Sequence, residues 1–270
     1  MKETLLSERN KRGNRERHLV FFDIDGTLAI GKDVPASARK GIASLRENGD
    51  LVFICTGRNH EYVKKNFSEY ADGFICSNGR IAYYEEKVIY DEPIDEETLN
   101  ILLSLLRKVD AGFVFHNRNE GFYEGPEELF EMICETGDSG YVKKGMDLNK
   151  GPFYNFDVCF HDEGHRERIK EALKDLCIMN PHGDSPHADM SVKGADKGDA
   201  LRAVADRLDV RIEDTYAFGD GLNDISMLKA AGHAIAMGNG QMETKRVAEY
   251  VSDDILKDGV YKGLKHYGLI

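Results

Sequence analysis

Short apolar runs alternate with helical segments in the first third of the chain. The runs at 19–22, 51–55 and 73–76 are rich in Val, Ile and Phe and are too short for independent helices, so each predicts a buried strand. The segment at about 35–48 carries apolar residues at helical spacing, and a second helix is expected at about 60–67. Strands that alternate with helices in this way predict right-handed crossovers and a doubly wound parallel sheet of the α/β class.

This alternation is interrupted in the middle of the chain and then resumes. Two runs at 81–84 and 87–90 predict an antiparallel hairpin, and further strands and helices follow without regular alternation. The apolar runs at 215–218 and 233–237 then predict strands that again alternate with helices. The pattern therefore predicts an α+β unit inserted into a Rossmann-like core.

The same pattern suggests domain boundaries. We expect the core to comprise 18–80 and 191–270, and the inserted α+β unit to comprise 81–190. The polar segment 1–17 lacks the apolar core of a signal peptide and is expected to be a disordered or frayed tail. No run approaches the roughly 20 apolar residues of a membrane span. These features predict a cytoplasmic protein.

Composition and charge narrow the classes of partner. Hydrophobic residues make up 41% of the 270 residues and charged residues 31%, which is ordinary for a globular protein with a substantial core. The net charge of -12 argues against general binding of nucleic acid or of an anionic membrane, although it permits phosphate binding at one local site. Five cysteines without CxxC spacing predict neither a disulfide framework nor a zinc site.

Two carboxylates stand at the end of the first predicted strand. The sequence HLVFFDIDGTL places Asp23 and Asp25 one residue apart, directly after the apolar run. On an extended chain their side chains point to opposite faces, so they serve one site only if the backbone turns, which Gly26 permits. Carboxylates at the carboxyl end of a parallel strand lie where open α/β sheets bind ligands. The alternative is a loop in which the aspartates cap a helix or close an Asx-turn.

Polar side chains also follow the other predicted strands or begin the helices beside them: Thr56, Asn78, Lys197, Asp220, Asn223 and Asp224. Taken singly, they have structural explanations. Thr56 and Asn78 are of residue types that often cap helices. Lys197 is compatible with a solvated lysine in the first turn of a helix. GDGLND is compatible with a turn followed by a helix N-cap. Together with the first motif they bring four carboxylates to one pocket. A cluster of oxygen ligands without His or Cys favours a hard cation, Mg²⁺.

The motifs occur in a characteristic order. DxDGT comes first, followed by a Thr after a strand, a Lys, and GDxxND. In this order they resemble the haloacid dehalogenase-like superfamily of aspartate-nucleophile phosphotransferases. The chain is more similar still to the Cof-type sugar-phosphate phosphatases, which carry a large α+β cap between the Thr and Lys motifs. The resemblance covers the chain from His18 to its C-terminus and implies the same core and cap.

A phosphate ester in such a pocket needs positive charge beside it. At about 4 Å and an effective dielectric constant of about 20, an aspartate repels each unit of phosphate charge by about 4 kcal/mol, so a dianion costs roughly 8 kcal/mol. Repulsion of this size slows attack by several orders of magnitude, because about 1.4 kcal/mol corresponds to a tenfold change in rate. A divalent cation and a lysine relieve this repulsion.

The resemblance implies a division of labour among the motif residues. Asp23 would attack phosphorus and form an aspartyl-phosphate, and Asp25 would protonate the departing alkoxide and later take a proton from water. Mg²⁺ would be held by the Asp23 carboxylate, the Asp25 main-chain carbonyl and Asp220. Asp224 would be either a ligand through water or a partner for Lys197. Lys197 would neutralise the charge of the phosphoryl oxygens.

The resemblance also implies a set of groups that bind the substrate: Thr56, Gly57, Asn78, Asn223 and the backbone amide of Asp25. The Thr56 hydroxyl and the backbone amides are expected to bind the phosphoryl oxygens. Arg80 follows SNG, where the relatives usually have a small residue. It is expected either to contact the substrate phosphate or to line the joint between core and cap.

The expected function is Mg²⁺-dependent hydrolysis of small phosphorylated metabolites, sugar phosphates first, by a monomer or homodimer without nucleic-acid or membrane partners. A phosphomutase similar to phosphomannomutase is the nearest enzymatic alternative, because its relatives share this layout. A non-catalytic module that senses a phosphorylated ligand is the alternative from another class. The intact Asp23, Asp25, Lys197 and Asp220 argue against such a module, because sensing requires no nucleophile.

Overall fold

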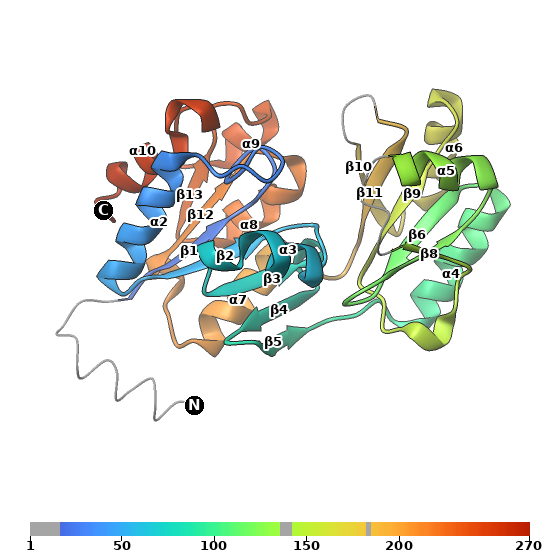
Figure 1. The fold of residues 1–270 in the computed structure, drawn as a ribbon, viewed down its shortest axis with the longest axis horizontal. Helices are drawn as coiled ribbons and strands as arrows, with labels where there is room; N and C mark the ends of the chain where they lie inside the picture. Colours follow the sequence, from blue (N-terminus) through green and yellow to red (C-terminus); the bar gives the residue numbers. More distant parts are fainter. Residues whose placement is uncertain (1–16, 136–141, 182–184) are drawn as a thin grey trace.

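The computed structural model describes residues 17–135, 142–181 and 185–270 and has two lobes, each built around its own sheet (Figure 1). Both ends of the described chain belong to the first lobe, and the second lobe is inserted between them (Figure 1). The tail expected at 1–17 lies, except for Arg17, outside the described residues.

The sheet of the first lobe has eight strands, in this order across it: β14 (Tyr250–Val251), β13 (His233–Ala236), β12 (Thr215–Gly219), β1 (Leu19–Phe22), β2 (Leu51–Cys55), β3 (Gly73–Cys76), β4 (Ile81–Tyr84) and β5 (Lys87–Asp91). Neighbouring strands from β14 to β3 are parallel, and β4 and β5 add an antiparallel edge. This arrangement confirms the predicted doubly wound parallel α/β core.

Helices cover both faces of this sheet, which explains the apolar runs. The residues of β1 have no exposed surface. Val20 and Phe22 face α2 (Ala36–Asn48), α3 (His60–Phe67) and α10 (Gly259–His266), whereas Leu19 and Phe21 face α7 (Lys197–Arg207) and α8 (Ile225–Ala230). A strand covered on both sides must be apolar throughout, so a continuous run predicts it. The remaining helix of this lobe is α9 (Met242–Val247).

The sheet of the second lobe has six strands, in this order across it: β10 (Cys177–Pro181), β11 (His187–Val192), β9 (Asn155–Cys159), β6 (Gly112–His116), β7 (Gly121–Glu124) and β8 (Val142–Lys144). Its helices are α4 (Glu96–Lys108), α5 (Glu127–Glu135) and α6 (Glu163–Leu173). α4 and α6 pack on one face against Phe115 and Phe156, and Leu129 of α5 packs on the other. None of the described helices combines the length and the apolar character needed to cross a bilayer.

The hairpin of β4 and β5 belongs to the first sheet, although we expected the inserted unit to begin at residue 81. β4 pairs antiparallel with β3, with Cys76 opposite Ile81. The connection at 77–80 is too short to carry the chain to another lobe, so the hairpin stays beside the strand that precedes it. The chain leaves the first lobe only after β5, and the inserted sheet ends with β11 at Val192.

Candidate active site

Asp23 and Asp25 follow β1 in a turn that sends their side chains in different directions. Asp23 continues the strand, because its backbone N–H donates to the carbonyl oxygen of Phe218 in β12 at 3.0 Å. Gly26 has a φ of +89°, a left-handed conformation that glycine adopts without strain. A Cβ added at Gly26 would lie 2.5 Å from Oδ2 of Asp220, so glycine also makes room for that carboxylate.

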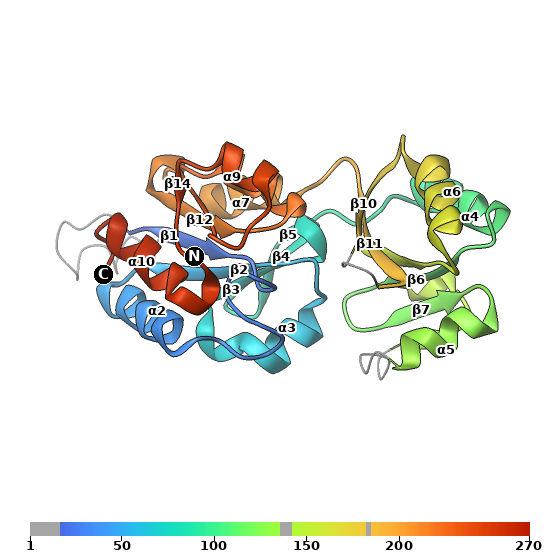
Figure 2. The ribbon, with the colours of Figure 1, turned by 90° about the horizontal axis from the view of Figure 1, so that it is seen from above.

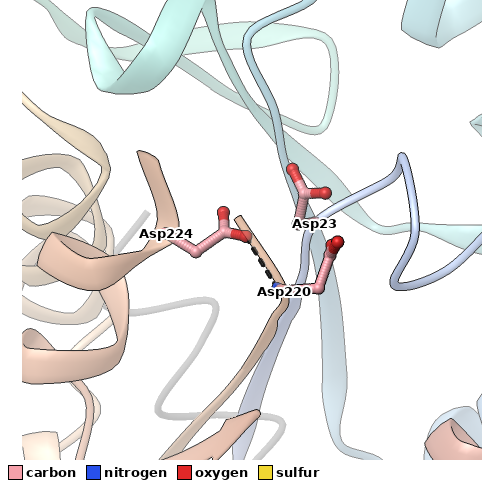
Figure 3. Close-up of side chains that lie close together, drawn as sticks. All are labelled: Asp23, Asp220 and Asp224. Carbon is pink, nitrogen blue, oxygen red and sulfur yellow. Dashed lines mark hydrogen bonds between the residues drawn. The ribbon is translucent and has the colours of Figure 1, made fainter. Parts of the chain in front are cut away.

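Three carboxylates converge where β1 and β12 end (Figure 3). Asp23, Asp220 and Asp224 each offer one oxygen atom, and these atoms all lie within 4.8 Å of one another. Burial raises the pKa of Asp23 well above its usual range, and the charge of Asp224 raises it further. Burial raises the pKa of Asp220 to about 6, although a hydrogen bond from Thr27 at 2.8 Å opposes the shift. The cluster therefore concentrates negative charge that a cation stabilises.

Lys197 supplies positive charge to this cluster. It is the first residue of α7, directly after Asp196, whose carboxylate caps the helix. Its Nζ contacts Oδ1 of Asp23 and Oδ1 of Asp224 at 2.7 Å each, and the residue is only 1% exposed. Burial lowers the pKa of a lysine, but the two carboxylates outweigh burial and raise the pKa of Lys197 above its usual range. Lys197 is therefore a charged partner of Asp23.

Asp224 uses both of its carboxylate oxygens within the protein. Oδ1 accepts from Lys197, and Oδ2 accepts from the backbone N–H groups of Asp220 and Gly221 at 2.9 Å each. These contacts fix the loop after β12 and the position of the lysine at the same time. Of the two roles expected for Asp224, they favour the partner of Lys197 over a metal ligand.

Thr56, Gly57, Asn78 and Asn223 lie together at the same edge of the sheet. The backbone N–H of Asn78 donates to the carbonyl oxygen of Thr56 at 3.0 Å, and Nδ2 of Asn223 donates to Oδ1 of Asn78 at 3.2 Å. A Cβ added at Gly57 would lie 3.1 Å from the Asn78 side chain. The structure thus brings these four expected substrate-binding residues next to one another.

Arg80 lies at the joint between the lobes. Its guanidinium group donates to the carbonyl oxygens of Glu92 (3.1 Å), Val192 (2.9 Å) and Lys193 (3.1 Å). Glu92 is on the crossing that leaves the first lobe, Val192 is the last residue of β11, and Lys193 begins the crossing that returns. Of the two positions expected for Arg80, these contacts favour the joint, because they engage both terminal nitrogens away from the carboxylate cluster.

Arg58 is a site residue that the sequence analysis missed. Its Nε lies 3.3 Å from Oδ2 of Asp25, and its guanidinium group stacks on the ring of Tyr62 at 4.9 Å from the centroid. This ion pair orients the Asp25 carboxylate, whose side chain is 50% exposed. The sequence did offer a signal for Arg58. It directly follows Thr56 and Gly57 after the end of β2, so it lies at the same edge of the sheet as those two residues.

Two side chains that hold the DxDGT turn were also missed. The Thr27 hydroxyl donates to Oδ1 of Asp220 at 2.8 Å. Nδ2 of Asn239 donates to the carbonyl oxygen of Gly26 at 2.7 Å, while its Oδ1 accepts from the backbone of Ile255 at 2.9 Å. Thr27 could have been identified from the sequence, because it is part of the DxDGT motif. Asn239 lies in the loop after β13, and no sequence pattern indicated its role.

Gly79 controls the position of Lys197, and we predict that Gly79→Ala lowers kcat/KM by about tenfold to a hundredfold. Gly79 has a φ of +97°, and an added Cβ would lie 2.1 Å from the carbonyl of Asp196 and 2.4 Å from the nitrogen of Lys197. Backbone atoms cannot rotate away, so the start of α7 must shift and move the Lys197 side chain. Steady-state kinetics on any phosphate ester that the protein hydrolyses measures the effect.

Gly31→Ala is the matched control for this prediction. Gly31 also has a positive φ, of +62°, but an added Cβ there meets no atom within 4 Å. Both variants carry the strain of a left-handed alanine, about 1–2 kcal/mol, and only Gly79→Ala carries the clash. Equal losses of activity in the two variants would show that the contact with α7 is unimportant.

The comparison with known families assigns the chain to a class. A sequence model of the family described as haloacid dehalogenase-like hydrolase matches residues 20–264. The chain therefore belongs to the haloacid dehalogenase-like hydrolase family. The resemblance inferred from the order of the four motifs is confirmed.

Individual relatives agree with this assignment. YkrA of Bacillus subtilis is 31% identical over 93% of this chain and 98% of its own length. The 5-amino-6-(5-phospho-D-ribitylamino)uracil phosphatase YcsE of the same species is 28% identical over 93% of this chain and 96% of its own. Among solved structures, the HAD subclass IIB sugar phosphatase BT4131 matches with a TM-score of 0.80 and 27% identity, over 94% of this chain and 100% of that one. This chain is thus similar to phosphatases along nearly its whole length.

Proposed function

We propose that this protein is a Mg²⁺-dependent phosphatase that hydrolyses small phosphorylated metabolites, principally sugar phosphates. The reaction proceeds through an aspartyl-phosphate on Asp23. The observation that carries the proposal is the buried carboxylate of Asp23, which Lys197 contacts at 2.7 Å and which shares a cluster with Asp220. The names of two relatives support the substrate class, since YcsE is named for a phosphoribityl compound and BT4131 as a sugar phosphatase.

Asp23 and Asp220 have the donor atoms that Mg²⁺ prefers. Within the described ranges the cluster consists of carboxylates alone, and oxygen ligands select hard cations. We assign the ion to the carboxylates of Asp23 and Asp220 and to the main-chain carbonyl of Asp25, with Asp224 holding Lys197. When bound, the ion supplies positive charge that lowers the repulsion between Asp23 and a phosphate dianion.

The residues of this chain divide the reaction between them. A carboxylate oxygen of Asp23 forms a bond to phosphorus while the bond from phosphorus to the leaving oxygen breaks. Asp25, oriented by Arg58, gives a proton to the leaving alkoxide and later accepts one from the water that hydrolyses the aspartyl-phosphate. Lys197, the Thr56 hydroxyl and the neighbouring backbone amides stabilise the charge on the phosphoryl oxygens.

The second lobe acts as a cap in this proposal. Nδ2 of Asn155 in β9 donates to the carbonyl oxygen of Gly57 at 3.1 Å, so the inserted sheet touches the segment that binds phosphate. A cap in this position excludes bulk water while a single water molecule attacks the aspartyl-phosphate. Arg80 links both crossings between the lobes and marks where the cap pivots.

Release of inorganic phosphate from a panel of sugar phosphates and p-nitrophenyl phosphate tests the proposed function. We expect turnover with Mg²⁺ and its loss after treatment with EDTA. Conversion of a hexose phosphate to an isomer, with little free phosphate, would identify a phosphomutase instead. The absence of any metal-dependent reaction across the panel would favour a module that senses phosphorylated ligands.

Mg²⁺ affinity is predicted to fall as the pH decreases through about 6. The pKa of Asp220 is raised to about 6, so below this pH a proton occupies the carboxylate that the ion requires. Displacement of one proton weakens the apparent affinity by up to about tenfold per pH unit below the pKa. Isothermal titration at about pH 7.5 and about pH 5 measures the change. Equal affinities at the two pH values would rule out Asp220 as a ligand with this pKa.

A further inference from the structure

The loop between β13 and α9 (237–241) contacts both segments that carry the assigned metal ligands. On one side, Nδ2 of Asn239 donates to the carbonyl oxygen of Gly26, in the turn after β1, at 2.7 Å. On the other side, the backbone N–H of Gln241 donates to the carbonyl oxygen of Asp220 at 2.9 Å. The loop contains no Asp, Glu or His, so it joins the two segments without a charged ligand of its own.

The orientation of the Asn239 amide is fixed by its partners on both sides. Its Oδ1 accepts from the backbone N–H of Ile255 at 2.9 Å. The other amide atom is therefore the nitrogen, and it meets the carbonyl oxygen of Gly26, which only accepts. The backbone N–H of Gly238 also donates to the carbonyl oxygen of Asp253 at 3.0 Å, so a second contact fixes the loop. Asn239 thus connects a fixed loop to the turn after β1.

Gly26 is the point in this turn where an outside contact matters most. It has a φ of +89°, and glycine has the widest backbone freedom, so the peptide groups on its two sides turn easily unless they are bonded. The peptide before Gly26 carries the carbonyl of Asp25, which we assigned to the ion. The peptide after it leads to Thr27, whose hydroxyl donates to Oδ1 of Asp220 at 2.8 Å. Rotation at Gly26 would therefore move one assigned ligand and release the hydrogen bond that orients another.

We propose that Asn239 is a positioning residue that sets the affinity of the carboxylate cluster for its divalent ion. The inference rests on the proposed function, because it assumes that the ion binds between Asp23 and Asp220, the side chains that converge in Figure 3. Asn239 acts through the backbone of Gly26 rather than through contact with the ion. Replacement of residues that orient metal ligands in this indirect way commonly weakens metal binding by about tenfold to a hundredfold.

Asn239→Asp tests this role, because position and charge predict opposite results. The aspartate keeps the acceptor for Ile255 but replaces the nitrogen, 2.7 Å from the Gly26 carbonyl oxygen, with an oxygen that this carbonyl repels. We expect the dissociation constant for Mg²⁺, measured by isothermal titration, to rise about tenfold or more. A residue that acted only through its charge would have the opposite effect, since an added carboxylate attracts a divalent cation. Asn239→Ala removes both hydrogen bonds without adding charge, and it carries the test if Asn239→Asp does not fold.

Asn48→Asp is the matched control. Nδ2 of Asn48, the last residue of α2, donates to the carbonyl oxygen of Leu269 at 2.9 Å, so the substitution removes the same kind of hydrogen bond. α2 ends just before β2 begins, whereas the carboxylate cluster lies where β1 and β12 end. Figure 2 shows α2 and the C-terminus at the end of the first lobe that faces away from the second lobe. This variant should lose stability but bind Mg²⁺ with the wild-type affinity.

Three results decide the outcome. Mg²⁺ affinity that is unchanged in both Asn239 variants, or that increases in Asn239→Asp, overturns the inference. An equal loss of affinity in Asn48→Asp also overturns it, because the effect would then follow from general stability. Failure of the wild-type protein to bind Mg²⁺ would instead refute the proposed metal site, and this inference with it.

Discussion

Asp23→Asn is expected to lower the rate of phosphate release by about 10³-fold or more while phosphate binding persists. The amide has the size of the carboxylate but lacks the charge and the nucleophilic oxygen that attack phosphorus. Thr56, Lys197 and the backbone amides remain in place, so the phosphoryl group still has its binding partners. Single-turnover kinetics measures the rate, and titration with orthophosphate measures binding.

Asp33→Asn is the control for this substitution, because Asp33 is exposed in the segment that follows the catalytic turn. It should retain the wild-type rate. The stability of Asp23→Asn should not fall, since the change removes one of three mutually repelling carboxylates. Normal turnover by a correctly folded Asp23→Asn protein would exclude covalent catalysis through this residue.

Lys197→Met is expected to destabilise the metal-free protein by about 3–5 kcal/mol and to abolish turnover. The substitution keeps the length of the side chain but leaves Asp23 and Asp224 buried without the cation that each contacts at 2.7 Å. Removal of one partner from a buried ion pair is costly because the remaining charge is uncompensated. Urea denaturation in the presence of EDTA measures the free energy of unfolding.

Mg²⁺ should recover part of this stability, because it supplies positive charge to Asp23, one of the two carboxylates that Lys197 contacts. Lys229→Met, at an exposed position in α8, is the control and should change the free energy of unfolding by no more than about 0.5 kcal/mol. A similar loss in the two variants would mean that the Lys197 ion pairs contribute little to the folded state.

The core sheet was predictable because its strands are buried on both faces. Such a strand must be apolar along its whole length, as in β1, where Leu19 to Phe22 are all fully buried. The carboxylate cluster was predictable for a related reason. Parallel strands end at one edge of the sheet, so polar residues that follow β1 and β12 meet there even though the sequence separates them widely.

The contacts between the lobes could not be predicted in this way. Asn155 reaches Gly57 only because the inserted sheet lies against the first lobe, and no local pattern encodes that placement. Arg58 is a different case, because it pairs with Asp25 inside the first lobe and its position directly after Thr56 and Gly57, at the end of β2, was a signal for this. The boundary at residue 81 was wrong because a hairpin looks the same in sequence whether it extends the sheet before it or begins a new one.

The central claim is that Asp23 and Asp220, from distant segments of the chain, share one divalent ion. Anomalous diffraction from crystals soaked in Mn²⁺, which takes the same oxygen ligands as Mg²⁺, tests this claim most directly. We predict one anomalous peak in contact with both carboxylates, absent from Asp220→Asn crystals treated identically. A peak that touches neither carboxylate, or no peak at saturating Mn²⁺, would contradict the account.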